Sequence, residues 1–195
     1  RVNVPIVPAM VIQLILEAAI VAILLVGLPI VSRLSLRQLG FTPISPGAVG
    51  TAVVGAIVMA IVVNGGASLV ETLTHQQHQQ QVVEMFKAVK NPAVMVFFGV
   101  FAITLAPIAE EIVFRVFIFN VGLRYGGFWL GAVVSGVLFG LAHGDLFVLA
   151  PLALGGLVLC YVYYRTRNAY ASMITHGLFN SITVFALIFA PNLAK

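Results

Sequence analysis

Two glutamates and an arginine stand within six residues of an otherwise apolar stretch. The segment 110–115 reads EEIVFR, and residues 91–109 before it contain no Asp, Glu, Lys or Arg. Glu111 and Arg115 are spaced i, i+4, so on a helix they share a face and can neutralise each other. Glu110 lies about 100° around the helix from Glu111 and cannot share that pairing equally. The spacing therefore predicts one carboxylate held in an ion pair and a second one, on Glu110, available for chemistry.

Two histidines accompany this motif farther along the chain. His143 ends the segment FGLAH, four residues after Phe139, and His176 opens the segment HGLFN, with Asn180 one helical turn later. Together with Glu110 these residues supply what hydrolysis needs: a carboxylate to take a proton from water, an imidazole to orient the water, and donors for an oxyanion. The structural alternative is a helix-packing network of ion pairs and interhelical hydrogen bonds without catalysis.

The sequence lacks the signatures of three known classes of intramembrane protease. No HExxH segment is present, so the common zinc-protease helix is missing. Asp145 is the only aspartate, which excludes a two-aspartate site, and Ser135 has Val133 rather than Gly two residues before it, unlike rhomboid-type serine proteases. Cys160 stands among Leu, Val and Tyr, where a thiol is predicted to be an inert packing group. A glutamate–histidine site remains.

Composition places these residues in a membrane. Of the 195 residues, 61% are hydrophobic and 8% are charged, compared with about 25% charged residues in ordinary soluble domains. Several runs without Asp, Glu, Lys or Arg come near or exceed the roughly 18 residues typical of a membrane span; these runs are 47–70, 91–109, 125–144, 146–164 and 168–194. The sequence therefore predicts an all-α fold, a polytopic transmembrane bundle of about six helices, as a single domain over residues 1–195. The predicted spans are about 5–30, 47–63, 92–119, 128–142, 147–164 and 171–189.

The bilayer sharpens the meaning of the EEIVFR segment. A charged side chain at a helix centre costs about 2.5–3.5 kcal/mol on the insertion scale, whereas a good apolar residue returns only about 0.3–0.6 kcal/mol. The insertion cost of Glu110, Glu111 and Arg115 could thus cancel most of the favourable insertion free energy of their whole helix. They are expected to face the interior of the bundle or a wet cavity.

Charges in the connectors predict the orientation. The first, third and fifth connectors are basic and contain no acidic residue; their arginines are Arg33, Arg37, Arg124, Arg165 and Arg167. The remaining connectors and the termini hold four basic residues, Arg1, Lys87, Lys90 and Lys195. The positive-inside rule therefore predicts that the odd-numbered connectors are cytoplasmic and that both ends of this chain lie outside. The basic balance reflects topology, and nucleic acid is not an expected partner.

The three motifs EEIVFR, FGLAH and HGLFN resemble the EExxxR, FxxxH and HxxxN motifs of the CPBP family. This family comprises the type II CAAX prenyl endopeptidases and their bacterial relatives, including bacteriocin-processing and immunity-type proteins. The resemblance covers about residues 100–190, within a motif-bearing core of about 92–190, and the motifs occur in the order found in the family. One departure is Val116, where many members have Gly directly after the motif arginine.

The resemblance implies a role for each motif residue. It implies that Glu110 and His143 activate the hydrolytic water and that His176 and Asn180 steady the oxyanion. The residues implied to support them are Glu111, Arg115 and Phe139. The implied protein is a multi-pass intramembrane endopeptidase of the inner or plasma membrane, acting on a peptide or membrane-protein substrate, lipidated or not, with no cofactor.

Two other functions remain open. A metal-dependent hydrolase could use Glu110, His143 and His176 as a two-His, one-carboxylate zinc set, although no i, i+4 ligand pair is present. A non-catalytic membrane scaffold or binding protein could keep the same polar residues for recognition or packing, because a fold does not fix an activity.

Two further features lead to expectations outside the motifs. Glu17, spaced i, i+4 from Gln13, is expected to be a neutral Glu in an interhelical hydrogen bond, and His75 and His78 are expected to lie in a solvated connector.

The relative depth of the two motif histidines leads to one more expectation. His143 lies about 22 Å along a helix that starts near 128, whereas His176 lies about 7 Å into its own helix. On parallel helices starting at one plane they could not meet, so helix tilt and projection of segment 120–130 into the cytoplasm are expected.

Overall fold

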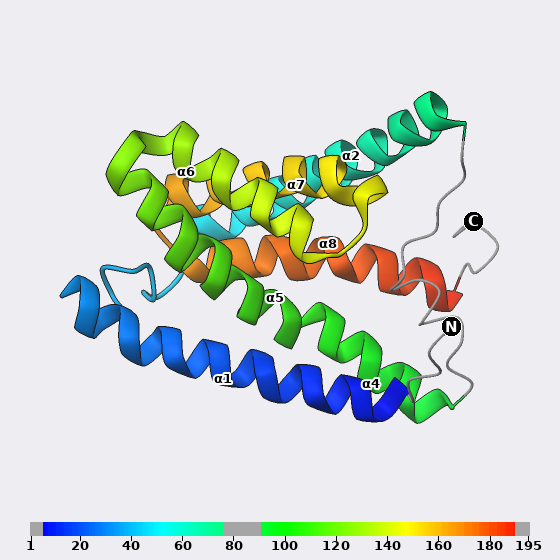
Figure 1. The fold of residues 1–195 in the computed structure, drawn as a ribbon, viewed down its shortest axis with the longest axis horizontal. Coiled ribbons are helices and arrows are strands. Elements are labelled where there is room, and N and C mark those ends of the chain that lie inside the picture. The colour runs from blue at the N-terminus through cyan, green and yellow to red at the C-terminus, as the bar shows by residue number, and fades with distance from the viewer. Residues whose placement is uncertain (1–5, 76–90, 190–195) are drawn as a thin grey trace.

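The fold is a bundle of helices. The computed structural model describes residues 6–75 and 91–189, except for the side chains of residues 6, 7, 9, 10 and 13. No strand occurs among these described residues, and the all-α prediction is confirmed. The helices, shown in Figure 1, are α1 (Ile6–Ser32), α2 (Pro46–Thr74), α4 (Pro92–Ile103), α5 (Leu105–Glu111), the π-helix η1 (Ile112–Phe119), α6 (Asn120–Ala142), α7 (Leu146–Thr166) and α8 (Ala169–Phe189).

Five stretches of the described chain are long and apolar enough to cross a membrane, and one of them contains two crossings. The helical stretch Pro92–Ala142 has 51 residues, which as a straight helix would measure about 77 Å against a hydrocarbon core of about 30 Å. The chain reverses within α6, at Gly126 (φ −145°, ψ 15°) and Gly127 (φ 75°, ψ −172°). Figure 1 shows the two legs returning side by side. The prediction of about six membrane-spanning helices is therefore confirmed, and the protein is a multi-pass membrane protein.

Glycines allow the two legs of this hairpin to pack closely. A Cβ on Gly122 would lie 2.5 Å from the Cα of Gly131, closer than real Cβ atoms come to a neighbour. Gly127 has a positive φ, which residues with a Cβ rarely adopt. The reversal thus depends on glycine at the turn and at the contact behind it.

Helix α2 is longer than the predicted span 47–63, and the expectation that a polar connector begins at residue 64 is wrong. The helix continues to Thr74, and His75 follows as an exposed C-cap in the left-handed conformation. Asn64, Thr72 and Thr74 each donate a side-chain hydrogen bond to the carbonyl four residues earlier. These polar side chains are satisfied by the helix itself, which lets the helix run on through polar sequence.

The basic connectors meet at one end of the bundle. The Asn168 amide donates to the Thr42 carbonyl at 2.8 Å, and the Ala169 N–H donates to the Gly40 carbonyl at 2.9 Å. Gly40 has φ +94°, and a Cβ there would meet the Ala169 nitrogen at 3.0 Å. At the same end the Asn120 amide donates to the Tyr163 hydroxyl at 2.8 Å. The three arginine-bearing connectors therefore share one side of the membrane, as the positive-inside pattern requires.

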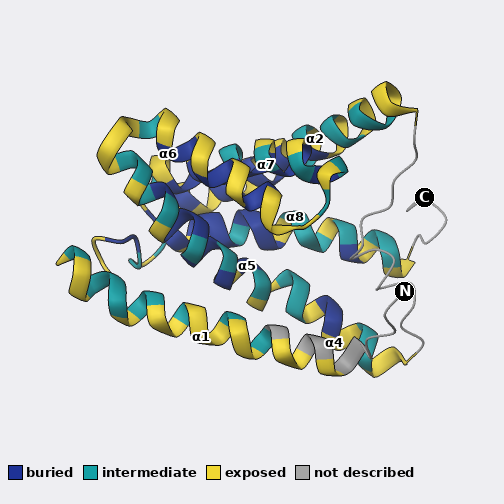
Figure 2. Cartoon of the chain, viewed as in Figure 1, coloured by how far each residue is buried: buried dark blue, intermediate teal, exposed yellow. Residues whose placement is uncertain are grey.

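Helix α7 lies at the centre of the packing and contacts α2, α6 and α8. Its approach to α6 is close, because a Cβ on Gly136 would lie 2.7 Å from the Ala153 carbonyl oxygen, and one on Gly140 would lie 2.5 Å from that of Leu149. Figure 2 shows buried positions concentrated where α6, α7 and α8 meet, whereas α1 is mostly half-buried or exposed. The exposed surface is rich in large apolar side chains, as expected for helices that face lipid.

Candidate active site

A buried ion pair anchors the site. The Glu111 Oε1 atom lies 3.0 Å from Arg115 Nη1, and neither side chain has any exposed surface. The two residues are one helical turn apart, as their spacing predicts. An unpaired charge in the bundle interior would be very costly, and here each side chain neutralises the charge of the other. Glu111 Oε2 has no hydrogen-bond partner among the described residues.

His176 on α8 connects the two glutamates. Its Nδ1 atom lies 3.0 Å from Glu111 Oε1, and its Nε2 atom lies 3.6 Å from Glu110 Oε2. A carboxylate only accepts hydrogen bonds, so Nδ1 carries the proton and donates to Glu111. Nε2 is thereby turned toward Glu110, whose side chain is 28% exposed while that of His176 is 4% exposed. The geometry separates a buried, paired carboxylate from a more accessible one, as predicted.

A π-helix holds Arg115 in place. Residues Ile112–Phe119 form this wider helix, and π-helical turns inside α-helices occur frequently at functional sites. The Ser135 hydroxyl donates to the Phe114 carbonyl at 2.7 Å, which ties the π-helix to the returning leg of α6. Arg115 Nη2 lies 3.4 Å from the Gly156 carbonyl oxygen on α7. The arginine thus joins η1 to α7 in addition to neutralising Glu111.

Phe139 lies between the charged cluster and the two histidines. The Arg115 guanidinium carbon is 4.5 Å from the centre of the Phe139 ring, within the range of a cation–π interaction. The same ring lies 4.9 Å from that of His143 and 5.5 Å from that of His176, both edge-on. Phe139 therefore contacts three of the predicted site residues at once, and its supporting position agrees with the motif.

His143 occupies the exposed C-terminal end of α6. Its Nδ1 atom lies 2.8 Å from the Phe139 carbonyl oxygen; because a carbonyl only accepts, Nδ1 donates and Nε2 is left as an acceptor. Within the described part of the chain His143 makes no ion pair with either glutamate, so Glu110 adjoins His176 rather than His143. The two histidines lie against the same Phe139 ring.

Phe128, at the start of the returning leg of α6, contacts the end of α7. The ring of Phe128 lies 5.0 Å from that of Tyr164 near the end of α7, and 5.8 Å from that of Phe119. The start of the returning leg is therefore level with the last turn of α7. The exposed turn before it includes Tyr125, which is 80% exposed.

Asn180 contacts the helix break between α4 and α5. Pro107 lacks an N–H group, so the Ile103 carbonyl loses its helical partner, and the helix is interrupted between α4 and α5. The Asn180 amide donates to the neighbouring Ala102 carbonyl at 2.8 Å. Gly177 lies against this break, since a Cβ there would be 2.7 Å from the Ile103 oxygen. One amide hydrogen of Asn180 is thus used to dock α8.

Three of these positioning residues were missed from the sequence. Ser135 is tested in the sequence only as a nucleophile, whereas in the structure its hydroxyl donates to the Phe114 carbonyl of the π-helix. Pro107, three residues before the glutamates, signalled a helix break. Gly156 follows another glycine, Gly155, in an apolar span, and this pattern of small residues signalled a close helix contact.

The remaining candidates lie apart from this site or outside the described residues. His75 is exposed at the end of α2, as expected, and Glu17 is half-buried on α1. The side chain of Gln13, and His78 with Lys87 and Lys90, lie outside the described residues. Within residues 6–75 and 91–189, no three His, Cys, Asp or Glu side chains are gathered closely enough to hold a metal ion.

The fold and the site together define a polytopic helical membrane protein with a Glu–Arg–His cluster inside its bundle. Residues 92–182 match the family model described as type II CAAX prenyl endopeptidase Rce1-like. Residues 92–182 are therefore similar to this family, and the resemblance to the CPBP family that the three motifs indicate is confirmed.

Similarity extends to a named relative. The Bacillus subtilis (strain 168) protein "Putative membrane peptidase YdiL" is 32% identical over 78 residues, which are 40% of this chain and 32% of that protein. The match thus spans about a third of the relative's length. No solved structure matches the chain. At the level of the family, these comparisons support a membrane peptidase.

Proposed function

We propose that the protein is an intramembrane endopeptidase in which Glu110 acts as the general base on water. The observation that carries the proposal is the position of His176. Its Nδ1 atom is held by the buried Glu111–Arg115 pair, and its Nε2 atom lies 3.6 Å from the accessible carboxylate of Glu110. A carboxylate next to an oriented imidazole is the arrangement that activates water for attack on a carbonyl. The family match and the peptidase-named relative support peptide hydrolysis as the reaction.

The reaction would proceed through a tetrahedral intermediate. A separation of 3.6 Å is too long for a good hydrogen bond, but one water oxygen can lie about 2.8 Å from both atoms. Glu110 takes a proton from this water as the oxygen attacks the carbonyl carbon. When the C–N bond breaks, the protonated Glu110 returns that proton to the leaving amine.

The other motif residues would serve the water and the oxyanion. In the proposal, His143 Nε2 orients the water, which requires its ring to approach Glu110 when substrate enters. The second amide hydrogen of Asn180 would donate to the developing oxyanion, and His176 would do so with a proton on Nε2, in addition to the proton on Nδ1 that it donates to Glu111. The substrate is a peptide segment of a membrane protein or of a lipid-anchored protein that reaches the site within the bilayer.

The experiment compares membrane proteomes of cells carrying wild-type protein, Glu110→Gln or Glu71→Gln. Glu110→Gln keeps the shape of the side chain and removes the base, so an uncleaved partner protein accumulates. Glu71 lies on α2 outside the motifs, and its substitution should leave the proteome unchanged. If the cellular role is retained in Glu110→Gln with no accumulating protein, the chain is a scaffold rather than a protease.

A zinc-dependent version of the reaction is favoured by one observation. Two ligands of a tetrahedral zinc ion at about 2.0–2.1 Å lie roughly 3.4 Å apart, close to the separation of His176 Nε2 and Glu110 Oε2. These two residues could hold zinc, which would polarise a water, and His143 would have to move to complete the set. Stoichiometric zinc in the purified protein, with activity lost on chelation and restored by zinc, would establish this version. Full activity in metal-free protein would contradict it.

A further inference from the structure

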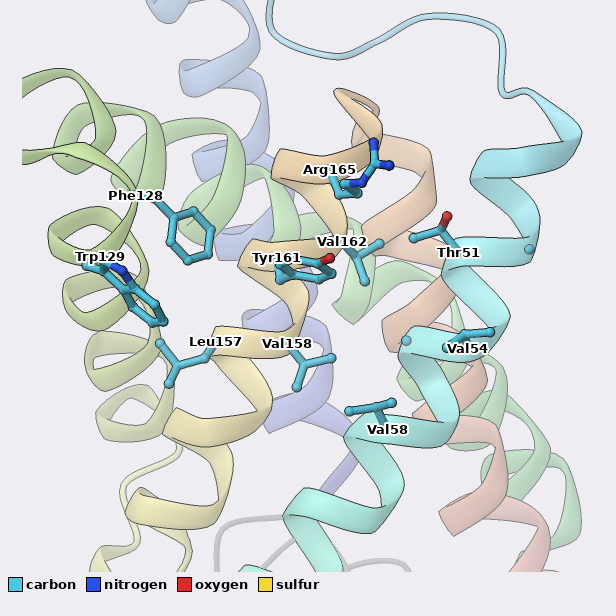
Figure 3. Close-up of a pocket in the computed structure, with 12 residues that line it drawn as sticks. Thr51, Val54, Val58, Phe128, Trp129, Leu157, Val158, Tyr161, Val162 and Arg165 are labelled. Atoms are coloured by element: carbon cyan, nitrogen blue, oxygen red, sulfur yellow. The ribbon is translucent and has the colours of Figure 1, made fainter.

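An apolar groove lies on the outer face of α7, between α2 and α6. Its volume is about 760 Å³, within the range of small-molecule sites. Leu157, Val158 and Tyr161 form its floor, spaced along one face of α7. Figure 3 shows Val54 and Val58 of α2 on one side of this floor and Phe128 and Trp129 of α6 on the other.

The groove opens to the side of the bundle. The exposed fractions of Val54 and Trp129, on its two walls, are 59% and 73%, and that of Tyr161 on the floor is 54%. All three helices that form it are among the membrane-spanning stretches. Exposed apolar surface on such helices faces lipid tails, so the groove is accessible from the bilayer.

One end of the groove is basic. Arg165 lines the groove in the last turn of α7, is exposed, and pairs with no carboxylate among the described residues. The connectors that meet at this end carry five arginines and no acidic residue. Tyr and Trp side chains such as Tyr161 and Trp129 are typical of the level of lipid headgroups. The site therefore combines a long apolar surface with an unpaired cation at its membrane–water end.

We infer that this groove binds one anionic phospholipid, with an acyl chain along α7 and the phosphate on Arg165. Charge complementarity selects the occupant, because an apolar helix from another protein would leave Arg165 without an anion. The site is separate from the candidate active site: Leu157 faces the groove, whereas the carbonyl of the preceding Gly156 accepts from Arg115. A bound lipid would contact α7 at Leu157, next to Gly156, whose carbonyl oxygen accepts from Arg115. The inference does not depend on the proposed function.

Native mass spectrometry of the full chain in mild detergent tests the inference. Phosphatidylglycerol and phosphatidylcholine with identical acyl chains are titrated separately, and the fraction of protein carrying one lipid is measured. The wild-type protein is expected to bind one phosphatidylglycerol saturably and more tightly than phosphatidylcholine. Arg165→Gln should weaken phosphatidylglycerol binding about fivefold, the contribution of one basic residue near a lipid surface. It should weaken phosphatidylcholine binding less, because the choline group offsets the charge of the phosphate.

A second variant fills the groove without disturbing the fold. A Cβ at Gly50, which lines the groove, meets nothing within 4 Å, and the same holds at Gly65 farther along α2 and outside the groove. Gly50→Leu should weaken binding of both lipids, whereas Gly65→Leu should not. Arg37→Gln removes an arginine from the same end of the bundle outside the groove and should leave binding unchanged.

Three outcomes would overturn the inference. Equal losses in Arg165→Gln and Arg37→Gln would mean that the lipid responds only to overall charge. Unchanged binding in Gly50→Leu would place the lipid elsewhere. A dimer of the chain that dissociates in Gly50→Leu, in place of bound lipid, would make the groove an interface between copies. Equal unfolding temperatures of all variants in lipid-free detergent show that each comparison is between folded proteins.

Discussion

At the scale of single residues, Arg115 is the centre of the polar cluster. It neutralises Glu111, lies over the Phe139 ring and reaches the Gly156 carbonyl, all without exposed surface. The i, i+4 spacing was enough to predict its pairing with Glu111. The contacts to Phe139 and Gly156 were not predictable from spacing, because they join helices whose relative rotation is decided by packing.

Replacing Arg115 tests the energetic role of the pair. Arg115→Leu leaves the buried Glu111 carboxylate without its cation and with only the hydrogen bond from His176, which is expected to cost about 3–5 kcal/mol in free energy of unfolding. The measurement is reversible unfolding in mixed micelles, followed by circular dichroism. The double variant Arg115→Leu with Glu111→Leu should recover a large part of the loss. A single variant as stable as the wild type would contradict a charged, mutually dependent pair.

Phe139 offers a second test at this scale. Phe139→Leu keeps an apolar side chain and removes the ring that contacts His143 and His176, so cleavage should fall at least tenfold while the unfolding temperature drops only modestly. Phe128, whose ring contacts lie at the turn of α6, is the matched control. Because Phe128 is half-buried whereas Phe139 is buried, Phe128→Leu should cost no more stability than Phe139→Leu and should have little effect on cleavage. Equal cleavage in both variants would contradict the positioning of the histidines by Phe139.

At the scale of elements, the break between α4 and α5 and the π-helix η1 shape the site. The sequence predicted a single helix over 92–119, because hydropathy and charge do not distinguish an interrupted helix from a continuous one. Pro107 was the visible sign of the break. The π-helix has no comparable signal, since it depends on Ser135 and Gly156 on other helices for the groups that contact it.

Gly177→Ala tests the close approach of α8 to this break. The added Cβ would lie 2.7 Å from the Ile103 carbonyl oxygen, so α8 must shift and carry His176 and Asn180 with it. We expect a loss of about 1–3 kcal/mol in free energy of unfolding, as for other overpacked interiors, and lower cleavage activity. Gly65→Ala, with nothing within 4 Å of its Cβ, should be neutral or slightly stabilising. Equal stability of the two variants would contradict the packing described.

At the scale of the whole molecule, the apolar spans and the basic first, third and fifth connectors predicted which helices form and which connectors lie at the same end of the bundle. The six predicted spans correspond to the helices, and the three basic connectors meet at one end. The end of α2 was predicted too early, because polar side chains that bond to their own helix are indistinguishable in sequence from those of a connector. The pairing of Glu110 with His176 rather than His143 was equally hidden, because helix crossings determine which motifs meet.

The predicted orientation can be measured with single cysteines. Arg37→Cys and Arg124→Cys should react with a membrane-impermeant maleimide only from the cytoplasmic side, and His75→Cys only from outside. Each variant is made with Cys160→Ser, and the serine variant without an added cysteine is the control. Labelling of the two arginine positions from opposite sides would contradict the shared end, and labelling of both from outside would reverse the orientation.

The catalytic role of Glu110 is tested most directly by the rate of cleavage of the accumulating partner protein, reconstituted with the enzyme in lipid nanodiscs. The account predicts that Glu110→Gln lowers kcat by at least about 10²-fold, the usual contribution of a general base. Glu71→Gln should retain the wild-type rate, and all three proteins should unfold at the same temperature. A wild-type rate in folded Glu110→Gln would contradict the assignment of Glu110 as the base.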